Sequence, residues 1–262
     1  MIVHKTRNYI LRLGKTPRED KFLERKIGIM KYLENKWALV TGSSRGIGQQ
    51  IALGLAQRKC NVVVHGRTES HTNETLELLK PYGIQTHVVS GDLGIKDEIQ
   101  AIIRKIKEKS VEIDILYNNA AIQSRWTPIW EFTEEDWLET FKINLFAMIT
   151  MCNAFAPEMK KRGYGRIINL TSGIKDIPQL VPYSVSKAAV DKYTCDLAAE
   201  LRNTNVLVNY LDPGWLRTDL GGPDADNAVE TVLPGALVPA LLEDNGPSGR
   251  FYCAQDYKCL EY

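Results

Sequence analysis

Tyr183 and Lys187 stand four residues apart and form the pair with the clearest chemical capability in the chain. In a helix, this spacing places the phenol and the ammonium on one face, one turn from each other. A free phenol has a pKa of about 10 and transfers protons poorly at neutral pH, whereas a nearby cation favours the phenolate. We therefore expect Tyr183 to be a general acid and base whose pKa is lowered by Lys187.

A serine adds a hydrogen-bond donor to this pair. Ser172 follows an apolar, β-branched run at 165–170 and precedes Tyr183 by eleven residues. Its hydroxyl can hydrogen-bond a substrate oxygen on which negative charge develops. A tyrosine and a lysine four apart are common on helix surfaces, so the pair gains its weight from Ser172 and from the motifs described below.

A glycine-rich segment has the composition of a phosphate-binding turn. It reads Thr41-Gly42-Ser43-Ser44-Arg45-Gly46-Ile47-Gly48 and directly follows a strand predicted at 37–41. Gly42 permits a tight turn, Gly46 lets the backbone approach a pyrophosphate, and Gly48 lets the next helix pack on the strand. The free N–H groups at the start of that helix then face the phosphates. The alternative is that these glycines serve an ordinary strand-to-helix turn.

Short apolar runs alternate with longer stretches of helical period from Trp37 onward, a pattern typical of repeated βαβ units. The predicted strands lie at 37–41, 61–65, 84–90, 114–117, 165–170, 205–211 and 250–253. The predicted helices lie at 46–58, 70–81, 95–109, 133–162, 183–202 and 226–242. Runs that are apolar at successive positions, such as 62–64, indicate a sheet covered on both faces. We expect an α/β fold with a single-domain, Rossmann-type doubly wound parallel sheet of about seven strands and helices on both faces.

Motifs that occur in the right order along the chain resemble those of the short-chain dehydrogenase/reductase family. The glycine turn matches that family's T-G-x-x-x-G-x-G. The other matching segments are Gly91-Asp92-Leu93 after the third strand, Asn118-Asn119-Ala120-Ala121 (N-N-A-G in the family) after the fourth, and Pro213–Thr218 (P-G-x-x-x-T) after the sixth. Ala121 departs from the family's glycine, which places an extra methyl beside the cofactor. The resemblance runs from about Leu33 to about Tyr252 and implies an NAD(P)(H)-dependent oxidoreductase.

This resemblance implies roles for individual residues. Lys187 would also hydrogen-bond the nicotinamide ribose, and Asn144 would hold a water in a relay from solvent to the lysine. The implied catalytic residues are Asn144, Ser172, Tyr183 and Lys187. The implied cofactor-binding residues are Gly42, Ser44, Arg45, Gly46, Ile47, Gly48, Arg67, Asp92, Leu93, Asn119, Ala120, Tyr183, Lys187, Pro213, Gly214 and Thr218.

The residues after the second strand favour NADP(H) over NAD(H). In NAD-binding relatives, an acidic residue ends this strand and binds the ribose hydroxyls, where it repels a 2′-phosphate. Gly66 holds that place here, and Arg67 follows it. Arg45 of the glycine turn projects towards the same region, so two guanidiniums can clamp the phosphate. Either arginine alone is equally well explained as a surface charge.

The composition excludes several other classes of function. The net charge of +1, from 33 basic and 32 acidic residues, provides no field for nucleic acid or an anionic membrane, so we expect a small-molecule carbonyl or alcohol as the partner. Five scattered cysteines fit a reducing cytoplasm and indicate no metal site. We find no apolar run long enough to span a bilayer and no secretory signal. The aromatic run Trp126–Trp137 is either a wall of the substrate pocket or a packing cluster.

The head of the chain differs in charge from the rest. Residues 1–36 carry ten Lys or Arg and four Asp or Glu. We expect residues 1–34 to be a basic N-terminal extension and residues 35–262 to be a dinucleotide-binding catalytic domain. A basic arm for an acidic partner and an organelle-targeting peptide are the alternatives. We favour a solvated extension, or sequence upstream of a start at Met30, because Glu19, Asp20 and Glu24 are unusual in a transit peptide.

Together these observations predict an oxidoreductase that transfers a hydride between NADP(H) and a carbonyl or alcohol. The ending Gly246–Tyr252, with Gly221-Gly222-Pro223 after Thr218, is most similar to the carbonyl reductase branch of the family. Family members usually pair through the helices matching 133–162 and 183–202, so we expect a homodimer or homotetramer. The alternative from another class is a nucleotide-binding sensor or scaffold protein of the same fold that does not turn over.

Overall fold

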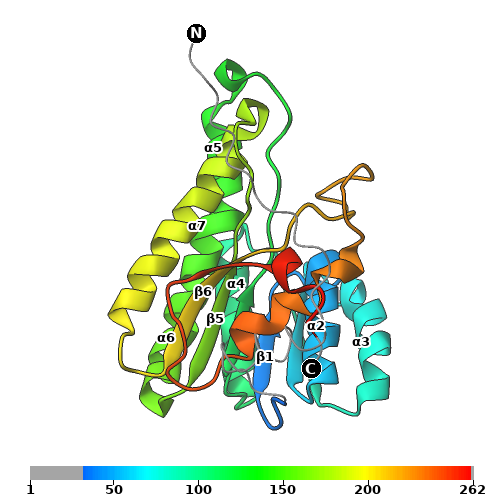
Figure 1. Cartoon of the computed structure of the whole chain (residues 1–262), viewed down its shortest axis with the longest axis vertical. Helices are drawn as coiled ribbons and strands as arrows, with labels where there is room; N and C mark the ends of the chain where they lie inside the picture. The colour runs from blue at the N-terminus through cyan, green and yellow to red at the C-terminus, as the bar shows by residue number, and fades with distance from the viewer. Residues whose placement is uncertain (1–31, 261–262) are drawn as a thin grey trace.

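The computed structural model describes residues 32–260, and these residues are built around a parallel sheet of seven strands in the order β3-β2-β1-β4-β5-β6-β7 (Figure 1). The strands are β1 (Trp37–Val40), β2 (Asn61–Gly66), β3 (Thr86–Ser90), β4 (Ile115–Asn118), β5 (Gly165–Leu170), β6 (Val206–Asp212) and β7 (Phe251–Cys253). The predicted fold class and all seven predicted strands are confirmed. The basic extension predicted at 1–34 lies outside the described residues apart from its last three, of which Leu33 is buried in the core.

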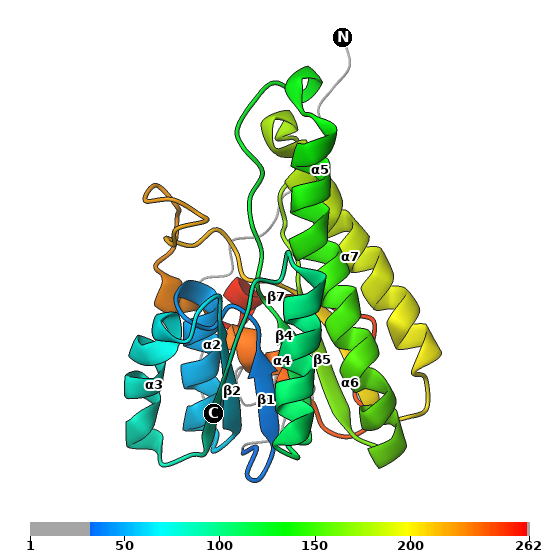
Figure 2. The same cartoon turned by 180° about the vertical axis from the view of Figure 1, so that it is seen from behind.

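Helices cover both faces of the sheet because the strands are apolar at successive positions. Val62 and Val64 belong to one core cluster and Val63 to the other, as the alternation of side chains along a strand requires. The first cluster is covered by α2 (Gly46–Gln57), α3 (Asn73–Leu79) and the segment 232–242. The second is covered by α4 (Lys96–Glu108), α6 (Met148–Arg162) and α7 (Val181–Glu200), as the reverse view also shows (Figure 2).

The long helix predicted at 133–162 is present but changes its winding in the middle. It begins as α5 (Glu134–Phe141), which Thr133 caps through a reciprocal pair of hydrogen bonds with Asp136. A π-helical turn, η4 (Lys142–Ala147), follows and leads into α6. Such turns are rare and occur most often at functional sites.

The prediction of an α-helix at 226–242 is wrong. This segment forms two 3-10 turns, η6 (Val229–Val232) and η7 (Gly235–Ala240). Pro234 and Pro239 have no N–H to donate, and a proline disfavours the α conformation of the residue before it. The apolar residues still face the core, since Ala236, Leu237 and Val238 are all buried. The hydrophobic pattern therefore located a buried segment but not its backbone conformation.

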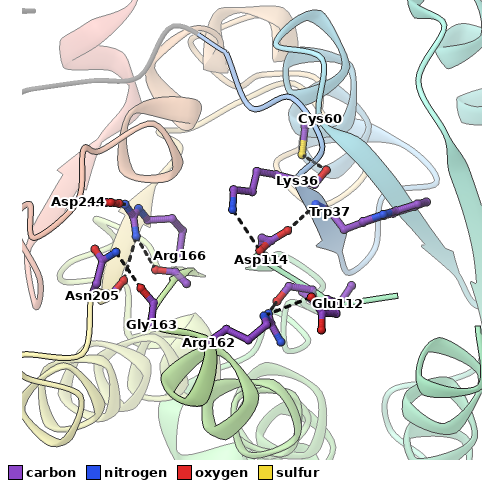
Figure 3. A network of polar contacts seen from close by, with 12 residues as sticks. Lys36, Trp37, Cys60, Glu112, Asp114, Arg162, Gly163, Arg166, Asn205 and Asp244 are labelled. Carbon is purple, nitrogen blue, oxygen red and sulfur yellow. Dashed lines mark hydrogen bonds and ion pairs between the residues drawn. The ribbon is translucent and has the colours of Figure 1, made fainter. Parts of the chain in front are cut away.

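Polar contacts close the amino-terminal end of the sheet (Figure 3). The fully buried Arg166 on β5 donates to the carbonyl oxygens of Gly165, Asn205 and Leu242 at 2.9 to 3.1 Å and pairs with Asp244 at 3.1 Å. Asp114, just before β4, accepts from the backbone of Trp37 at 3.0 Å. These polar groups are hydrogen-bonded or ion-paired within the fold and are not available to a ligand. A site can therefore form at the opposite, carboxyl-terminal edge of the sheet.

Candidate active site

The sequence motifs meet at the carboxyl ends of four neighbouring strands. In the sheet, β1 lies between β2 and β4, so the chain order reverses at the boundary between β1 and β4. Crevices at such points of reversal are the usual ligand sites of open α/β sheets. The glycine turn, the Asn118–Ala121 segment, Ser172 and Pro213 follow β1, β4, β5 and β6 respectively, so parallel pairing brings them to one edge.

The glycine turn has the backbone that its sequence predicts. Gly42 and Gly46 have φ of 64° and 58°, in the left-handed region that favours glycine. A Cβ built on Gly48 would clash with the carbonyl oxygen of Gly42 and lie 2.6 Å from Nδ2 of Asn119. Gly48 is therefore required for the close contact between α2 and the turn.

The amino end of α2 is open to an anion. Its N-cap, Arg45, is extended and makes no side-chain cap, and the first turn contains no acidic residue. The free N–H groups and the helix dipole therefore favour negative charge here. Ser44 and Ile47 are half-buried beside it. These features fit the phosphates of a dinucleotide.

Thr41 and Asn119 tie the turn to the end of β4. The hydroxyl of Thr41 accepts hydrogen bonds from the backbone N–H of Asn119 at 3.0 Å and of Ala120 at 3.1 Å, and donates to the carbonyl of Tyr117. The side-chain amide of Asn119 donates to the carbonyl oxygens of Thr41 at 2.8 Å and Gly42 at 3.2 Å. The predicted cofactor residues Asn119 and Ala120 are thus placed directly against the glycine turn.

The segment after β3 carries the next predicted cofactor residues. Oδ1 of Asp92 accepts from the backbone of Gly94 at 2.7 Å, and the backbone N–H of Asp92 donates to Glu98 at 2.6 Å. Leu93 is buried in the second core cluster. These bonds fix the conformation of the segment at the strand edge.

Sequence reasoning missed His65, which joins this segment to the glycine turn. Its Nδ1 accepts from the backbone N–H of Gly42 at 2.9 Å, and its Nε2 lies 3.1 Å from the carbonyl oxygen of Gly91. The signal in the sequence was His65 itself, a single polar residue directly after the apolar run 62–64 of β2.

The predicted proton donor is buried at the start of α7. Tyr183 follows Pro182 in the first turn of this helix, and the side chain of Ser172 lies close enough to its phenol to lower the pKa. Burial, opposed by Ser172 and assisted by the negative charge of Asp212, raises the pKa of Tyr183 to about 12. The prediction that Lys187 lowers this pKa is wrong for this structure, because the pKa lies above its ordinary value and Lys187 is not among the groups that shift it.

Lys187 lies one turn along α7 and is also buried. Its Nζ donates to the carbonyl oxygen of Leu170 at 2.9 Å and lies 5.7 Å from the centre of the Tyr183 ring. Burial lowers the pKa of Lys187 to about 8, and the carboxylate of Asp191 opposes this effect. The ammonium is therefore mainly charged at neutral pH.

Asn144 lies in the π-helical turn η4 and connects it to the site. Its side chain accepts from the N–H of Ile122 and donates to the carbonyl of the same residue, both at 2.9 Å. Its Nδ2 also donates to Ser186 at 3.1 Å, whose hydroxyl donates to the carbonyl of Tyr183 at 2.7 Å. The structure thus brings Asn144 together with the first turn of α7, along with Ser172 and Lys187.

The segment after β6 lies beside the glycine turn. Gly214 accompanies Pro213 in the turn, and the methyl group of Thr218 lies 3.5 Å from the position of a Cβ built on Gly46. Nε of Arg45 forms an ion pair with Asp219 at 2.9 Å, and both side chains are mainly exposed. Arg67 is exposed at the end of β2.

The aromatic run 126–137 does not form a packing cluster at its start. Trp126 is 67% exposed and Trp130 is 90% exposed. Within residues 32–260, no helix combines the length and apolarity needed to cross a membrane.

A Rossmann-type sheet with this turn and this Ser, Tyr and Lys arrangement defines a dinucleotide-dependent oxidoreductase class. The model of the short chain dehydrogenase family matches residues 36–228, and the chain belongs to this family. It is 36% identical to "Dehydrogenase/reductase SDR family member 4" of Sus scrofa over 72% of this chain and 68% of that protein. It is 32% identical to "5-keto-D-gluconate 5-reductase" of Escherichia coli K12 over 72% and 74%.

Solved structures agree with this assignment. A gluconate 5-dehydrogenase from Burkholderia cenocepacia J2315, determined in complex with NADP and tartrate, superimposes with a TM-score of 0.75 at 25% identity. The match covers 88% of this chain and 98% of that one. NADP in such structural neighbours supports a nicotinamide cofactor for the family fold seen here.

The contact at Gly48 leads to a prediction. Gly48→Ala should weaken binding of NADP+ at least about tenfold, because the added methyl must push the turn away from α2. Gly54→Ala is the matched control: it adds a methyl to the same helix, where the nearest atoms are the side-chain ends of Leu233 and Leu237. Titration calorimetry measures both. Equal affinity in Gly48→Ala and the wild type would contradict this account of the turn.

Proposed function

We propose that this protein transfers a hydride between NADP(H) and a carbonyl or alcohol substrate, with Tyr183 as the general acid and base. The observation that carries the proposal is the buried Tyr183 phenol, which lies beside Ser172 at the same sheet edge as the glycine turn. When bound, the nicotinamide supplies or accepts the hydride. The glycine turn, Asn119, Ala120 and Thr218 would hold the cofactor.

The chain's own residues provide the proton chemistry. In the reductive direction, Oη of Tyr183 donates its proton to the substrate oxygen, and the Ser172 hydroxyl donates a hydrogen bond to the same oxygen. The raised pKa of Tyr183 keeps the phenol protonated at neutral pH, as a general acid must be. The nearby ammonium of Lys187 favours the tyrosinate left behind. Asn144 is proposed to position the water through which Tyr183 is reprotonated.

A nucleotide sensor without turnover is the competing function. An assay of NADPH oxidation with small aldehydes and ketones distinguishes the enzyme from the sensor. The assay includes 5-keto-D-gluconate because of the Escherichia coli relative. Reduction of any of them supports the enzyme, and NADPH binding without reduction of any supports the sensor. We further propose that the protein belongs to the carbonyl reductase branch of the family. We also propose a cytoplasmic location, because the reducing conditions of the cytoplasm fit the five free cysteines.

The first prediction for this function concerns Tyr183. Tyr183→Phe should lower turnover by at least about 10² while the dissociation constant of NADP+ changes little, because only the hydroxyl is removed. Since the pKa of Tyr183 lies at about 12 and that of Lys187 at about 8, carbonyl reduction by the wild type should stay constant from about pH 6 to pH 7 and then fall towards about pH 9, as the Lys187 ammonium that favours the tyrosinate is lost. Alcohol oxidation needs the deprotonated form and should rise with pH over that range. Near-wild-type turnover in Tyr183→Phe would identify another group as the acid.

The preference for NADP(H) is proposed from Gly66, Arg67 and Arg45. Gly66 provides no carboxylate to repel a 2′-phosphate. Arg67 is exposed at the end of β2, and the Arg45–Asp219 ion pair lies in solvent, where such pairs contribute less than about 1 kcal/mol. A doubly charged phosphate therefore competes readily for Arg45.

Kinetic constants test this preference. The wild type should show kcat/KM at least about tenfold higher with NADPH than with NADH, and Arg67→Ala or Arg45→Ala should lower only the NADPH value. Arg202→Ala, which removes an exposed arginine at the far end of α7, is the control. Gly66→Asp is less suitable, because a Cβ there would lie 3.1 Å from the carbonyl oxygen of Thr68. Equal efficiency with both cofactors in the wild type would disprove the preference.

A homodimer or homotetramer is proposed to form through α5, η4 and α7. Leu138, Phe146 and Val185 on these elements are 44%, 50% and 40% exposed. Light scattering of the wild type at micromolar concentration should give at least twice the chain mass, and Phe146→Glu should lower it. A monomeric wild type would contradict the proposal. If Phe146→Glu has the same mass as the wild type, the interface between subunits lies away from Phe146.

A further inference from the structure

His65 is a buried histidine whose two ring nitrogens are both engaged by backbone groups. It lies on β2 and is 3% exposed. Nδ1 accepts from the N–H of Gly42 at 2.9 Å, and Nε2 lies 3.1 Å from the carbonyl oxygen of Gly91. Because a carbonyl oxygen only accepts and an amide N–H only donates, Nε2 must carry the proton and Nδ1 must be bare. These two contacts specify one neutral tautomer.

The two groups that His65 joins belong to different loops of the proposed cofactor site. Gly42 is the tight-turn glycine of the phosphate-binding segment, and Gly91 immediately precedes Asp92. The backbone of His65 also exchanges hydrogen bonds with Ser43: its N–H donates to Oγ at 2.9 Å, and its carbonyl accepts from the N–H of Ser43 at 3.0 Å. One residue therefore fixes the ends of β1 and β3 on either side of β2.

We propose that His65 is a positioning residue for the adenosine-diphosphate half of the dinucleotide, and that it works only as the neutral, Nε2-protonated imidazole. It holds the phosphate-binding turn and the Gly91–Leu93 segment at one separation. Protonation would place a second donor opposite the Gly42 N–H and remove that bond. This inference rests on the proposed function, because it assigns a dinucleotide to this edge of the sheet.

The surroundings of the ring keep it neutral. Burial lowers the pKa of His65 to about 4, and the hydrogen bond to the Gly91 carbonyl and the carboxylate of Asp92, after β3, only partly oppose this effect. From the β1 side the ring meets the uncharged backbone of Gly42, and Thr75 of α3 donates to the carbonyl of the neighbouring Ser43 at 2.8 Å. The free energy of unfolding should consequently fall as the pH drops from about 6.5 towards 4, since the unfolded chain binds the proton more tightly.

Two substitutions separate positioning from simple packing. His65→Leu fills the space but leaves the half-buried Gly42 N–H without its acceptor, which should raise the dissociation constant of NADP+ and of ADP-ribose about tenfold. His65→Asn retains an oxygen near the place of Nδ1 and should bind both within about threefold of the wild type. Turnover at saturating NADPH should change less than about twofold in either variant. Val63→Ala is the control, since it removes buried apolar volume from the same strand, in the second core cluster, without touching the bonds of His65.

Calorimetry, unfolding and NMR of the full chain give distinct outcomes. Absence of NADP+ binding by the wild type would overturn the proposed function itself. Binding by the wild type and equally tight binding by a folded His65→Leu would overturn the role of His65 alone. If His65→Leu does not fold, the wild-type imidazole ¹⁵N shifts decide. A protonated Nε2 with a bare Nδ1 at neutral pH, together with slow exchange of the Gly42 amide, supports the proposal, whereas a charged ring or the other tautomer refutes it.

Discussion

The contact between Thr41 and Asn119 holds together the edge on which the rest of the site depends. β1 and β4 are neighbours in the sheet, but β2 and β3 lie between them in the sequence. The turns that follow β1 and β4 therefore come from distant parts of the chain. Thr41 accepts two backbone hydrogen bonds from the β4 end, and Asn119 returns two from its side-chain amide. Gly48 has no side chain, so α2 packs directly against Gly42 and Asn119. The start of α2, the glycine turn and the end of β4 therefore form one rigid unit.

Burial dominates the electrostatics on the catalytic side of that edge. It raises the pKa of Tyr183 and lowers that of Lys187, so desolvation moves the two values apart, to about 12 and about 8. Asp212 and Asp191 reinforce the neutral phenol and the charged ammonium respectively. The phenol of Tyr183 therefore keeps its proton, with a cation one helical turn away. This is the protonation state from which reduction of a carbonyl begins.

Sequence patterns predicted the elements and the motif residues far better than the polar contacts behind them. The seven strands could be predicted because parallel, doubly covered strands are apolar at every position. The segment 226–242 was mistaken for a helix because apolar spacing reports burial, while Pro234 and Pro239 decide the backbone. The π-helical turn at Asn144 and the bonds of His65 depend on partners 22 and 23 to 26 residues away, which no local pattern encodes.

The same distinction explains why the chemistry is easier to infer from this chain than its substrate. Residues that handle protons and phosphates must be buried or rigid, and burial leaves a signature in the types and spacing of residues. By contrast, the segments 172–179, before Tyr183, and 217–224, around Thr218, contain no buried residue. The loop that carries Trp126 and Trp130 meets the loop before α7 through a hydrogen bond from Thr127 to Gln179 at 3.4 Å, and both tryptophans remain exposed. The fold therefore places few constraints on these two side chains.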